Sequence, residues 1–195
     1  MQRFIHSFLV ISLSALVALG CGGDTAVDPP DNDDDANQAS TIEFTIAGQS
    51  YTLDVLPAAY SSSTTGKTAI SGSTLPGVTP FQGISLAFKL MGAGSVRMDN
   101  TGNTVTDDGF EIVIGDRTFR TFYYECVNGN SELAYTEPGT VTIESANPTT
   151  RRIRGTFTGQ LASLVPIKVM CGSFEYDKYE LYTVTGRFTS DWMTI

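Results

Sequence analysis

Two stretches near the C-terminus decide the fold: residues 152–161 read RIRGTFTGQL, and residues 182–188 read YTVTGRF. In each stretch apolar residues and glycines alternate with polar residues, which is the period-two pattern of a strand with one buried face. The buried faces would hold Ile153, Gly155, Phe157, Gly159 and Leu161 in the first stretch and Tyr182, Val184, Gly186 and Phe188 in the second. Glycine weakens a strand interior. We therefore interpret these glycines as structural devices, for close backbone approach or sharp bending, and not as a binding motif.

The same alternation continues outward from these stretches toward residue 41. It recurs at Ile42, Phe44 and Ile46, at Tyr51, Leu53 and Val55, at Ile84, Leu86, Phe88 and Leu90, and at Phe110, Ile112 and Ile114. Turn signals separate the runs, and one strand is expected from Arg117 to Cys126. Residues 56–69, rich in Ser and Thr, are interpreted as a loop. The sequence predicts an all-β chain with a single antiparallel β-sandwich or barrel-like domain over residues 41–195.

Composition narrows the class of protein. The chain has 195 residues, of which 41% are apolar, enough for one core and one domain. The 21 acidic residues outnumber the 12 basic ones, for a net charge of -9. This balance argues against a nucleic-acid partner, because such binding depends on Lys and Arg at the phosphates.

The N-terminus has the layout of a signal peptide. Arg3 precedes a mostly apolar run from Phe4 to Leu19, which serine and histidine interrupt, so a membrane-spanning helix is the less favoured interpretation. The run ends at Ala18-Leu19-Gly20-Cys21, which resembles the lipobox of bacterial lipoproteins. The resemblance implies a lipoprotein signal peptide over residues 1–20, with lipid on Cys21. Ordinary cleavage after the small-x-small pattern is the alternative.

Residues 21–40 are expected to form a lipidated cysteine and a disordered acidic tether. After Cys21 the segment holds six Asp and no Lys or Arg, so it buries too little apolar area to order itself. In the usual sorting rule for bacterial lipoproteins, an Asp directly after the lipidated cysteine favours retention in the inner membrane. Gly22 and Gly23 follow Cys21 here, which favours the outer membrane. We expect a protein of the cell envelope, attached to the outer membrane through its N-terminal lipid.

The number of cysteines predicts a disulfide. If Cys21 carries lipid, Cys126 and Cys171 remain, and exported compartments are oxidising. A bond between them would close a loop spanning 45 positions (171 minus 126). Two buried free thiols are the alternative. A zinc site is not expected, because His6 is the single histidine and lies within the signal peptide.

A family resemblance extends over residues 41–195 in outline. The stretch GTVTIESANPTTRRIRGTFTGQL (Gly139 to Leu161), GSF (Gly172 to Phe174) and IAGQSYTL (Ile46 to Leu53) resemble Bacteroidota-type all-β surface lipoproteins of uncharacterised function. The resemblance implies a surface lipoprotein and carries over no catalytic residue.

Candidate sites in the domain are few. Without histidine in the mature chain there is no Ser-His-Asp triad, and no cofactor is expected. Tyr123, Tyr124 and Trp192 are candidate ligand-contacting aromatics, although core packing also explains them; one of the two adjacent tyrosines should be exposed. The arginines at 151, 152 and 154 suit either an anionic ligand or, preferably, a solvated strand face.

We expect a non-enzymatic binding or envelope component whose partner is a glycan or an envelope protein. Three alternatives stay open: a glycan-binding or adhesion module, a lipocalin-like carrier with an apolar cavity, and a carboxylate-based glycoside hydrolase. The acids that the last would use are Glu111, Glu125, Glu175 and Asp177.

Overall fold

The alternating segments form strands and nothing else. The computed structural model describes residues 39–54, 58–75, 77–98 and 109–194, and these residues form thirteen strands and no helix. The predicted all-β class is confirmed. The signal peptide, Cys21 and the acidic tether lie outside the described residues. Within the described ranges no helix could serve as a membrane span.

The strands have the following bounds: β1 Thr41–Ile46, β2 Gln49–Leu53, β3 Ala58–Ser62, β4 Lys67–Ser73, β5 Gln82–Phe88, β6 Gly94–Arg97, β7 Gly109–Ile114, β8 Arg117–Arg120, β9 Phe122–Val127, β10 Asn130–Tyr135, β11 Thr140–Asn147, β12 Arg152–Cys171 and β13 Phe174–Thr194.

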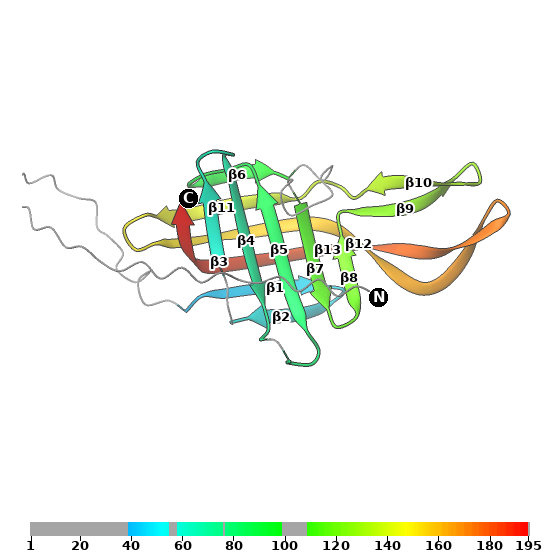
Figure 1. Ribbon diagram of the computed structural model, residues 1–195, viewed down its shortest axis with the longest axis horizontal. Coiled ribbons are helices and arrows are strands. Elements are labelled where there is room, and N and C mark those ends of the chain that lie inside the picture. Colours follow the sequence, from blue (N-terminus) through cyan, green and yellow to red (C-terminus); the bar gives the residue numbers. More distant parts are fainter. Residues whose placement is uncertain (1–38, 55–57, 76, 99–108, 195) are drawn as a thin grey trace, which may run out of the picture. The chain divides into compact units, whose positions relative to one another are not determined.

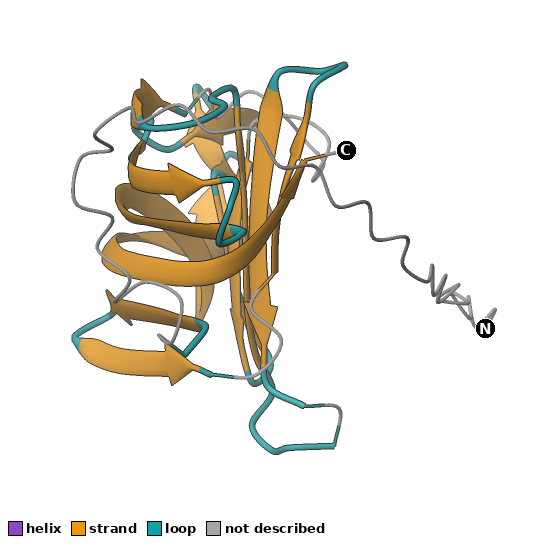
Figure 2. Cartoon of the chain, turned by 90° about the vertical axis from the view of Figure 1, so that its left-hand side faces the viewer, coloured by secondary structure: helices purple, strands orange, loops and turns teal. Residues whose placement is uncertain are grey.

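Eleven strands form one hydrogen-bonded sheet that folds into two layers (Figures 1 and 2). One layer has the order β2-β1-β13-β12-β11-β6, and the other has the order β3-β4-β5-β7-β8. The strands of the two layers run across each other, and pairings of β13 with β3 and of β12 with β8 join the layers at two corners. Because β12 also pairs with β13, the hydrogen-bonded circuit is closed. One pairing departs from the expected antiparallel arrangement: β13 and β3 run parallel.

The core lies between the two layers, and both contribute their inward faces to it. The predicted buried faces are confirmed: Ile42, Phe44 and Ile46 of β1 are buried, as are Ile153, Phe157 and Leu161 of β12 and Val184 and Phe188 of β13. These residues belong to one hydrophobic cluster, whose side chains pack in the space between the two layers. A lipocalin-like carrier would need an apolar cavity in that space.

The expected close approach at the strand glycines is confirmed. In the β12–β13 ladder Gly155 pairs with Phe188 and Phe157 pairs with Gly186, so each ring lies across from a glycine. A β-carbon on Gly155 would collide with the carbonyl oxygen of Thr142 and with the Phe188 ring. The glycines therefore give the phenylalanine rings room at the centre of the layer.

Two expectations about strands were wrong. The run from Arg117 to Cys126 is not one strand, because the chain leaves the large sheet at buried Thr121, whose carbonyl accepts a hydrogen bond from the Thr136 amide. Residues 56–69 are not simply a loop, since they include β3 and the start of β4. Ser61 and Thr68 are buried there and hydrogen-bonded to each other at 2.6 Å, so hydroxyl groups occupy positions where the pattern looked for apolar residues.

Arg152 also departs from the preferred solvated-face interpretation. Its side chain is 10% exposed. Its guanidinium donates to Asp191 Oδ1 at 2.6 Å and to Ser40 Oγ at 2.8 Å. Arg154 agrees better with a solvated face, because it is half exposed and lies 4.0 Å from Glu144. Arg152 thus ties the start of β12 to β13 and to the residue before β1.

The strands β12 and β13 have 20 and 21 residues, which is two and three times the length of the predicted stretches 152–161 and 182–188. Their far ends extend beyond the two layers (Figure 1). The β9–β10 hairpin lies beside this extension. We call these two hairpins, residues 122–135 and 164–181, the arm.

Candidate functional site

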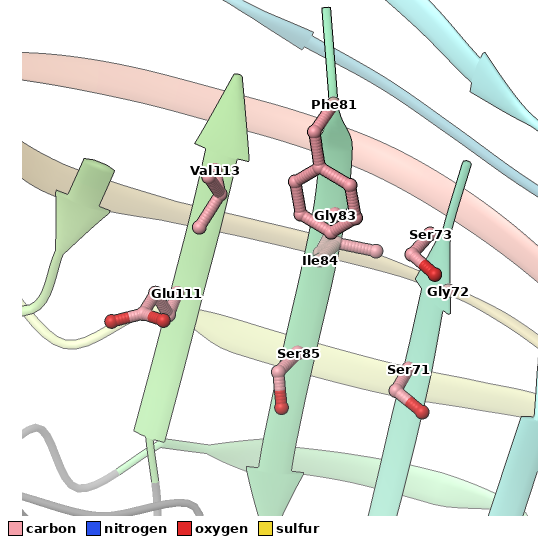
Figure 3. A pocket seen from close by; sticks show the side chains of 9 residues that line it. All are labelled: Ser71, Gly72, Ser73, Phe81, Gly83, Ile84, Ser85, Glu111 and Val113. Atoms are coloured by element: carbon pink, nitrogen blue, oxygen red, sulfur yellow. The ribbon is translucent and has the colours of Figure 1, made fainter. Parts of the chain in front are cut away.

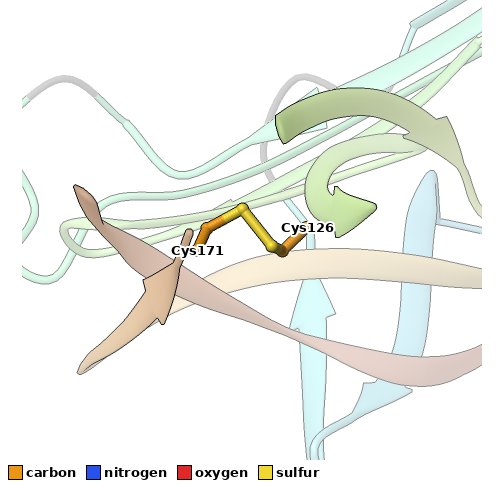
Figure 4. The surroundings of a disulfide bond; sticks show 2 residues. All are labelled: Cys126 and Cys171. Atoms are coloured by element: carbon orange, nitrogen blue, oxygen red, sulfur yellow. A yellow bond between two sulfur atoms is a disulfide. The ribbon is translucent and has the colours of Figure 1, made fainter. Parts of the chain in front are cut away.

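The tip of the arm is closed by a disulfide. Cys126 of β9 and Cys171 at the end of β12 are bonded, with their Cα atoms 5.6 Å apart (Figure 4). The turns of the two hairpins also meet here, since a β-carbon on Gly172 would lie 2.9 Å from the carbonyl oxygen of Gly129. The predicted pairing is confirmed, and the two hairpins are held together as one unit.

The arm carries most of the apolar side chains that remain exposed. Eight of the fourteen large apolar side chains exposed in the described residues belong to it. They are Tyr124, Leu133, Tyr135, Leu164, Ile167, Met170, Phe174 and Leu181. A concentration of exposed apolar side chains on a protein surface is typical of an interaction surface.

Acidic residues outnumber basic residues on the arm. The β9–β10 hairpin contains two glutamates and no Lys or Arg, while residues 164–181 contain three acids and two lysines. The arm therefore has a net charge of −3, from five acids and two bases. Lys168 Nζ is paired with Asp177 Oδ1 at 2.5 Å, and Lys178 with Glu180 at 3.5 Å. The basic groups are thus already neutralised within the arm.

The sequence-predicted aromatics do not form one surface. Tyr124 is 46% exposed and Tyr123 is half-buried, which confirms that one of the pair faces solvent. The Tyr123 ring lies 6.1 Å from that of Tyr179, between the two hairpins. Trp192 lies elsewhere, against the core near β3, and its indole N–H donates to Ser61 Oγ at 2.9 Å.

Two arm tyrosines have altered acidity. Burial raises the pKa of Tyr179, the Arg120 charge opposes this, and Tyr124 and Asp177 add to the increase. Burial, followed by the charge of Glu125, also raises the pKa of Tyr123. A phenol of ordinary pKa is already protonated at neutral pH, and the raised pKa values extend the pH range over which both side chains stay hydrogen-bond donors.

A groove of about 820 Å³ opens where the arm leaves the layers. The groove opens because the hydrogen-bonded pairing of β8 with β12 is short, with only the two residue pairs Arg120↔Ala162 and Phe119↔Ser163. Beyond Ser163 the β12 register shifts, and Pro166, which has no N–H to donate, lies within the irregular segment. The two strands separate there, and the groove forms between them.

Charged, aromatic and aliphatic side chains line this groove. The charged ones are Asp116, Arg117, Arg120 and Asp177, the aromatic ones are Phe122, Tyr179 and Tyr182, and Leu164, Val165 and Pro166 of β12 add an aliphatic wall. The carbon at the centre of the Arg117 guanidinium lies 4.7 Å from the centroid of the Phe119 ring and 5.3 Å from that of Tyr182. The groove thus combines cations with ring surfaces, an arrangement that sequence spacing did not indicate.

A smaller hollow of about 310 Å³ lies on the outer face of β4, β5 and β7 (Figure 3). Ser71, Ser85 and Glu111 are cross-strand neighbours on its floor. The Phe81 ring lies over Gly83, within 3.2 Å of where a β-carbon would be. The hollow is shallow, and its one carboxylate accepts a hydrogen bond from Arg120 Nε at 2.9 Å.

Three of the four candidate carboxylates of the hydrolase hypothesis lie on the arm, and Glu111 lies outside it. Glu111 is paired with Arg120 on the outer face of β7, and Asp177 is paired with Lys168 on the arm. Glu125 and Glu175 are exposed on the two hairpins of the arm. Within the part of the chain that the structure describes, no group of three or more His, Cys, Asp or Glu side chains could hold a metal ion.

Comparison with known proteins adds no relative. No protein-family model matches the chain, no curated protein matches it, and no solved structure matches its fold. Within the described residues, the disulfide-braced arm and the groove at its base are the candidate site.

Proposed function

We propose that the chain is an exported, membrane-anchored binding protein of the cell envelope, non-enzymatic, which contacts a protein partner through the arm. The observation that carries the proposal is the concentration of exposed apolar side chains on two hairpins braced by a disulfide. A rigid apolar surface suits binding because little conformational entropy is lost when the partner docks.

Export and anchoring are supported by the chemistry of the chain. The Cys126–Cys171 disulfide fits an oxidising compartment outside the cytosol. The lipobox-like Ala18-Leu19-Gly20-Cys21 would place lipid at the N-terminus, ahead of the acidic tether. In this proposal the chain is a Bacteroidota-type surface lipoprotein attached to the outer membrane, and the tether lets the domain search for its partner.

The charge pattern of the arm supports a partner of a particular chemistry. The arm combines exposed apolar groups with a net charge of −3. The partner surface that complements it is an apolar patch with a rim of basic residues. The same charge disfavours direct docking on anionic lipid. An envelope protein with such a patch is therefore the partner that we propose.

The anchor is tested by Cys21→Ala in the expressing cell. The wild-type protein should fractionate with membranes and carry acyl chains by intact mass, whereas Cys21→Ala should be soluble and lack them. A wild-type protein found in the cytosol with residues 1–20 attached would refute the export proposal.

The arm is tested by photo-crosslinking in cells. Met170 on the arm is 62% exposed and Met193 near the end of β13 is 61% exposed, so the two positions form a matched pair. A photoreactive residue at 170 should yield a discrete protein adduct that Leu164→Ser and Ile167→Ser abolish, and one at 193 should not. Equal labelling at the two positions, or labelling insensitive to the serine variants, would contradict binding by the arm.

A further inference from the structure

The groove at the base of the arm has a chemistry different from that of the arm surface. The arm presents apolar groups with acids, while the groove presents two arginines beside aromatic rings. We propose that this groove is a second binding site, which takes a small organic anion that joins a carboxylate or phosphate group to a flat ring. Arg117 holds the anionic group, and the ring lies against the aromatic and apolar wall.

Arg117 is placed in advance for this role. Its guanidinium packs on Phe119 and Tyr182, whose own rings meet edge to face at 5.5 Å. Phe119 is 1% exposed and belongs to the core, so the surface beneath Arg117 is fixed. Stacking leaves the N–H groups at the edge of the guanidinium, which is the geometry for bidentate binding of a carboxylate or phosphate.

Arg117 also forms no ion pair with any described residue, whereas its neighbour Arg120 is paired. Arg120 donates through Nε to Glu111 and lies 5.7 Å from the Phe122 ring. Glu111 therefore balances much of the Arg120 charge and fixes its position. Arg117 is therefore the cation left to a ligand.

The two acidic residues of the groove, Asp116 and Asp177, do not prevent Arg117 from binding an anion. Asp177 is neutralised by Lys168 at 2.5 Å. Asp116 is exposed in the turn between β7 and β8, directly before Arg117. Its charge weakens the attraction for an anion, so removing it should strengthen binding. Tyr179 adds a neutral hydroxyl group to the lining of the groove.

The rest of the groove lining is apolar and aromatic, which suits the flat ring of the proposed ligand. Leu164, Val165 and Pro166 face the groove from β12, opposite the β8 side, and Phe122 and Tyr182 add aromatic surface. The groove is large enough for a drug-sized molecule at about 820 Å³. An inorganic anion would use Arg117 and leave this wall unfilled, so a ring-bearing anion should bind more tightly.

The experiment titrates the whole mature chain with benzoate, phenyl phosphate, inorganic phosphate and neutral benzamide, and follows amide and arginine Nε–H signals by NMR. Benzoate and phenyl phosphate should shift the signals of Arg117, Thr118 and Val165 with a Kd of about 1 mM or better. Inorganic phosphate should bind more weakly, and benzamide should leave the signals unchanged. Equal shifts with benzamide, or no shift with the two ring anions, would overturn the proposal.

Variants separate the anion contact from general effects. Arg117→Gln should weaken benzoate binding about tenfold, since it removes a charged hydrogen-bond donor. Arg97→Gln, at an exposed arginine of β6 outside the groove, should leave binding unchanged. If Arg117→Gln fails to fold, Asp116→Asn tests the same point, because it should tighten benzoate binding several-fold. Unchanged or weaker binding in a folded Asp116→Asn would contradict the site.

Discussion

Phe157 lies directly across the β12–β13 ladder from Gly186, and its ring occupies the space that a side chain at position 186 would need. The arrangement repeats in reverse two residues away, where Phe188 lies across from Gly155. A large ring and a missing side chain thus fit together twice within one pair of strands. This complementarity allows the longest hairpin of the protein to form the centre of one layer.

The first prediction concerns this packing. Gly186→Ala should lower the free energy of unfolding by about 1–3 kcal/mol, the range for overpacked cores, because its β-carbon would collide with Phe157 and lie 2.5 Å from the Glu43 carbonyl oxygen. Gly159→Ala, in β12, is the control, since its β-carbon would meet its nearest neighbour at 3.4 Å. Urea unfolding followed by tryptophan fluorescence measures both. Equal stability of the two variants would show that the ring contact does not limit packing.

The second prediction concerns the disulfide. Replacing Cys126 and Cys171 together by serine removes a cross-link between residues 45 positions apart. The loop-entropy relation gives a loss of about 4 kcal/mol in the free energy of unfolding. Hydrogen exchange should also accelerate at β9 and β10, which pair with no strand of the large sheet. Unchanged unfolding free energy and unchanged exchange in the double variant would contradict a bracing role.

The third prediction concerns a chain of buried hydroxyl groups. Trp192 Nε1 donates to Ser61, Ser61 and Thr68 are 2.6 Å apart, and Thr68 donates to the Leu90 carbonyl. Since each hydroxyl has one proton, Ser61 must donate to Thr68. Thr68→Val would leave the Ser61 hydroxyl and the Leu90 carbonyl without this partner, at a cost of about 1–3 kcal/mol in stability.

Thr185→Val is the control for that variant, because Thr185 is exposed on β13 and the substitution there leaves the hydroxyl chain intact. Thermal unfolding of the two variants should differ clearly, with the lower midpoint for Thr68→Val. A Thr68→Val protein as stable as Thr185→Val would mean that the buried hydrogen bonds contribute no net stability.

The fourth prediction concerns pH. The pKa values of Tyr123 and Tyr179 are raised above 10.0 in the folded state, so the folded chain prefers the neutral phenols. Their contribution to stability is complete below pH 10 and is lost as pH rises through the raised values, because the unfolded chain ionises first. Tyr179→Phe should therefore reduce the fall in unfolding free energy between about pH 9 and pH 11.

The readout for this prediction is urea unfolding at a series of pH values, together with phenolate absorbance. Tyr60→Phe, an exposed tyrosine of β3, controls for the loss of one hydroxyl. If both variants followed the wild-type pH dependence, burial of the Tyr179 phenol would have no energetic consequence.

Much of the fold was predictable because it depends on local alternation. Ile42, Phe44 and Ile46 are buried on the face that the pattern assigned, and the glycines of β12 and β13 make the expected close approaches. The two wrong expectations, on residues 56–69 and on the run from Arg117 to Cys126, have the same cause, which is hydrogen bonding to residues that lie elsewhere in the chain. Ser61 and Thr68 look like loop residues until their partners are known, and Thr121 looks like a strand residue until the Thr136 amide binds its carbonyl.

The binding surfaces were less predictable than the fold. The sequence indicates Tyr123 and Tyr124 as ligand-contacting aromatics, and both belong to the arm. No sequence pattern indicates Arg117, because its proposed role depends on Phe119 in β8 and on Tyr182, which is 65 positions away (182 minus 117). No spacing rule connects an arginine to a ring across two strands.

The sequence by itself determined the all-β class and the inward faces of the strands, because periodicity is a property of the chain alone. The cysteine count predicted the Cys126–Cys171 pairing only on the premise that Cys21 carries lipid, and the structure shows the bond. Only the tertiary structure decided that β12 and β13 extend into an arm and that a groove opens beside Arg117. These features arise where the β8–β12 ladder ends after two pairs. The end of a ladder depends on contacts between distant segments, which local patterns do not encode.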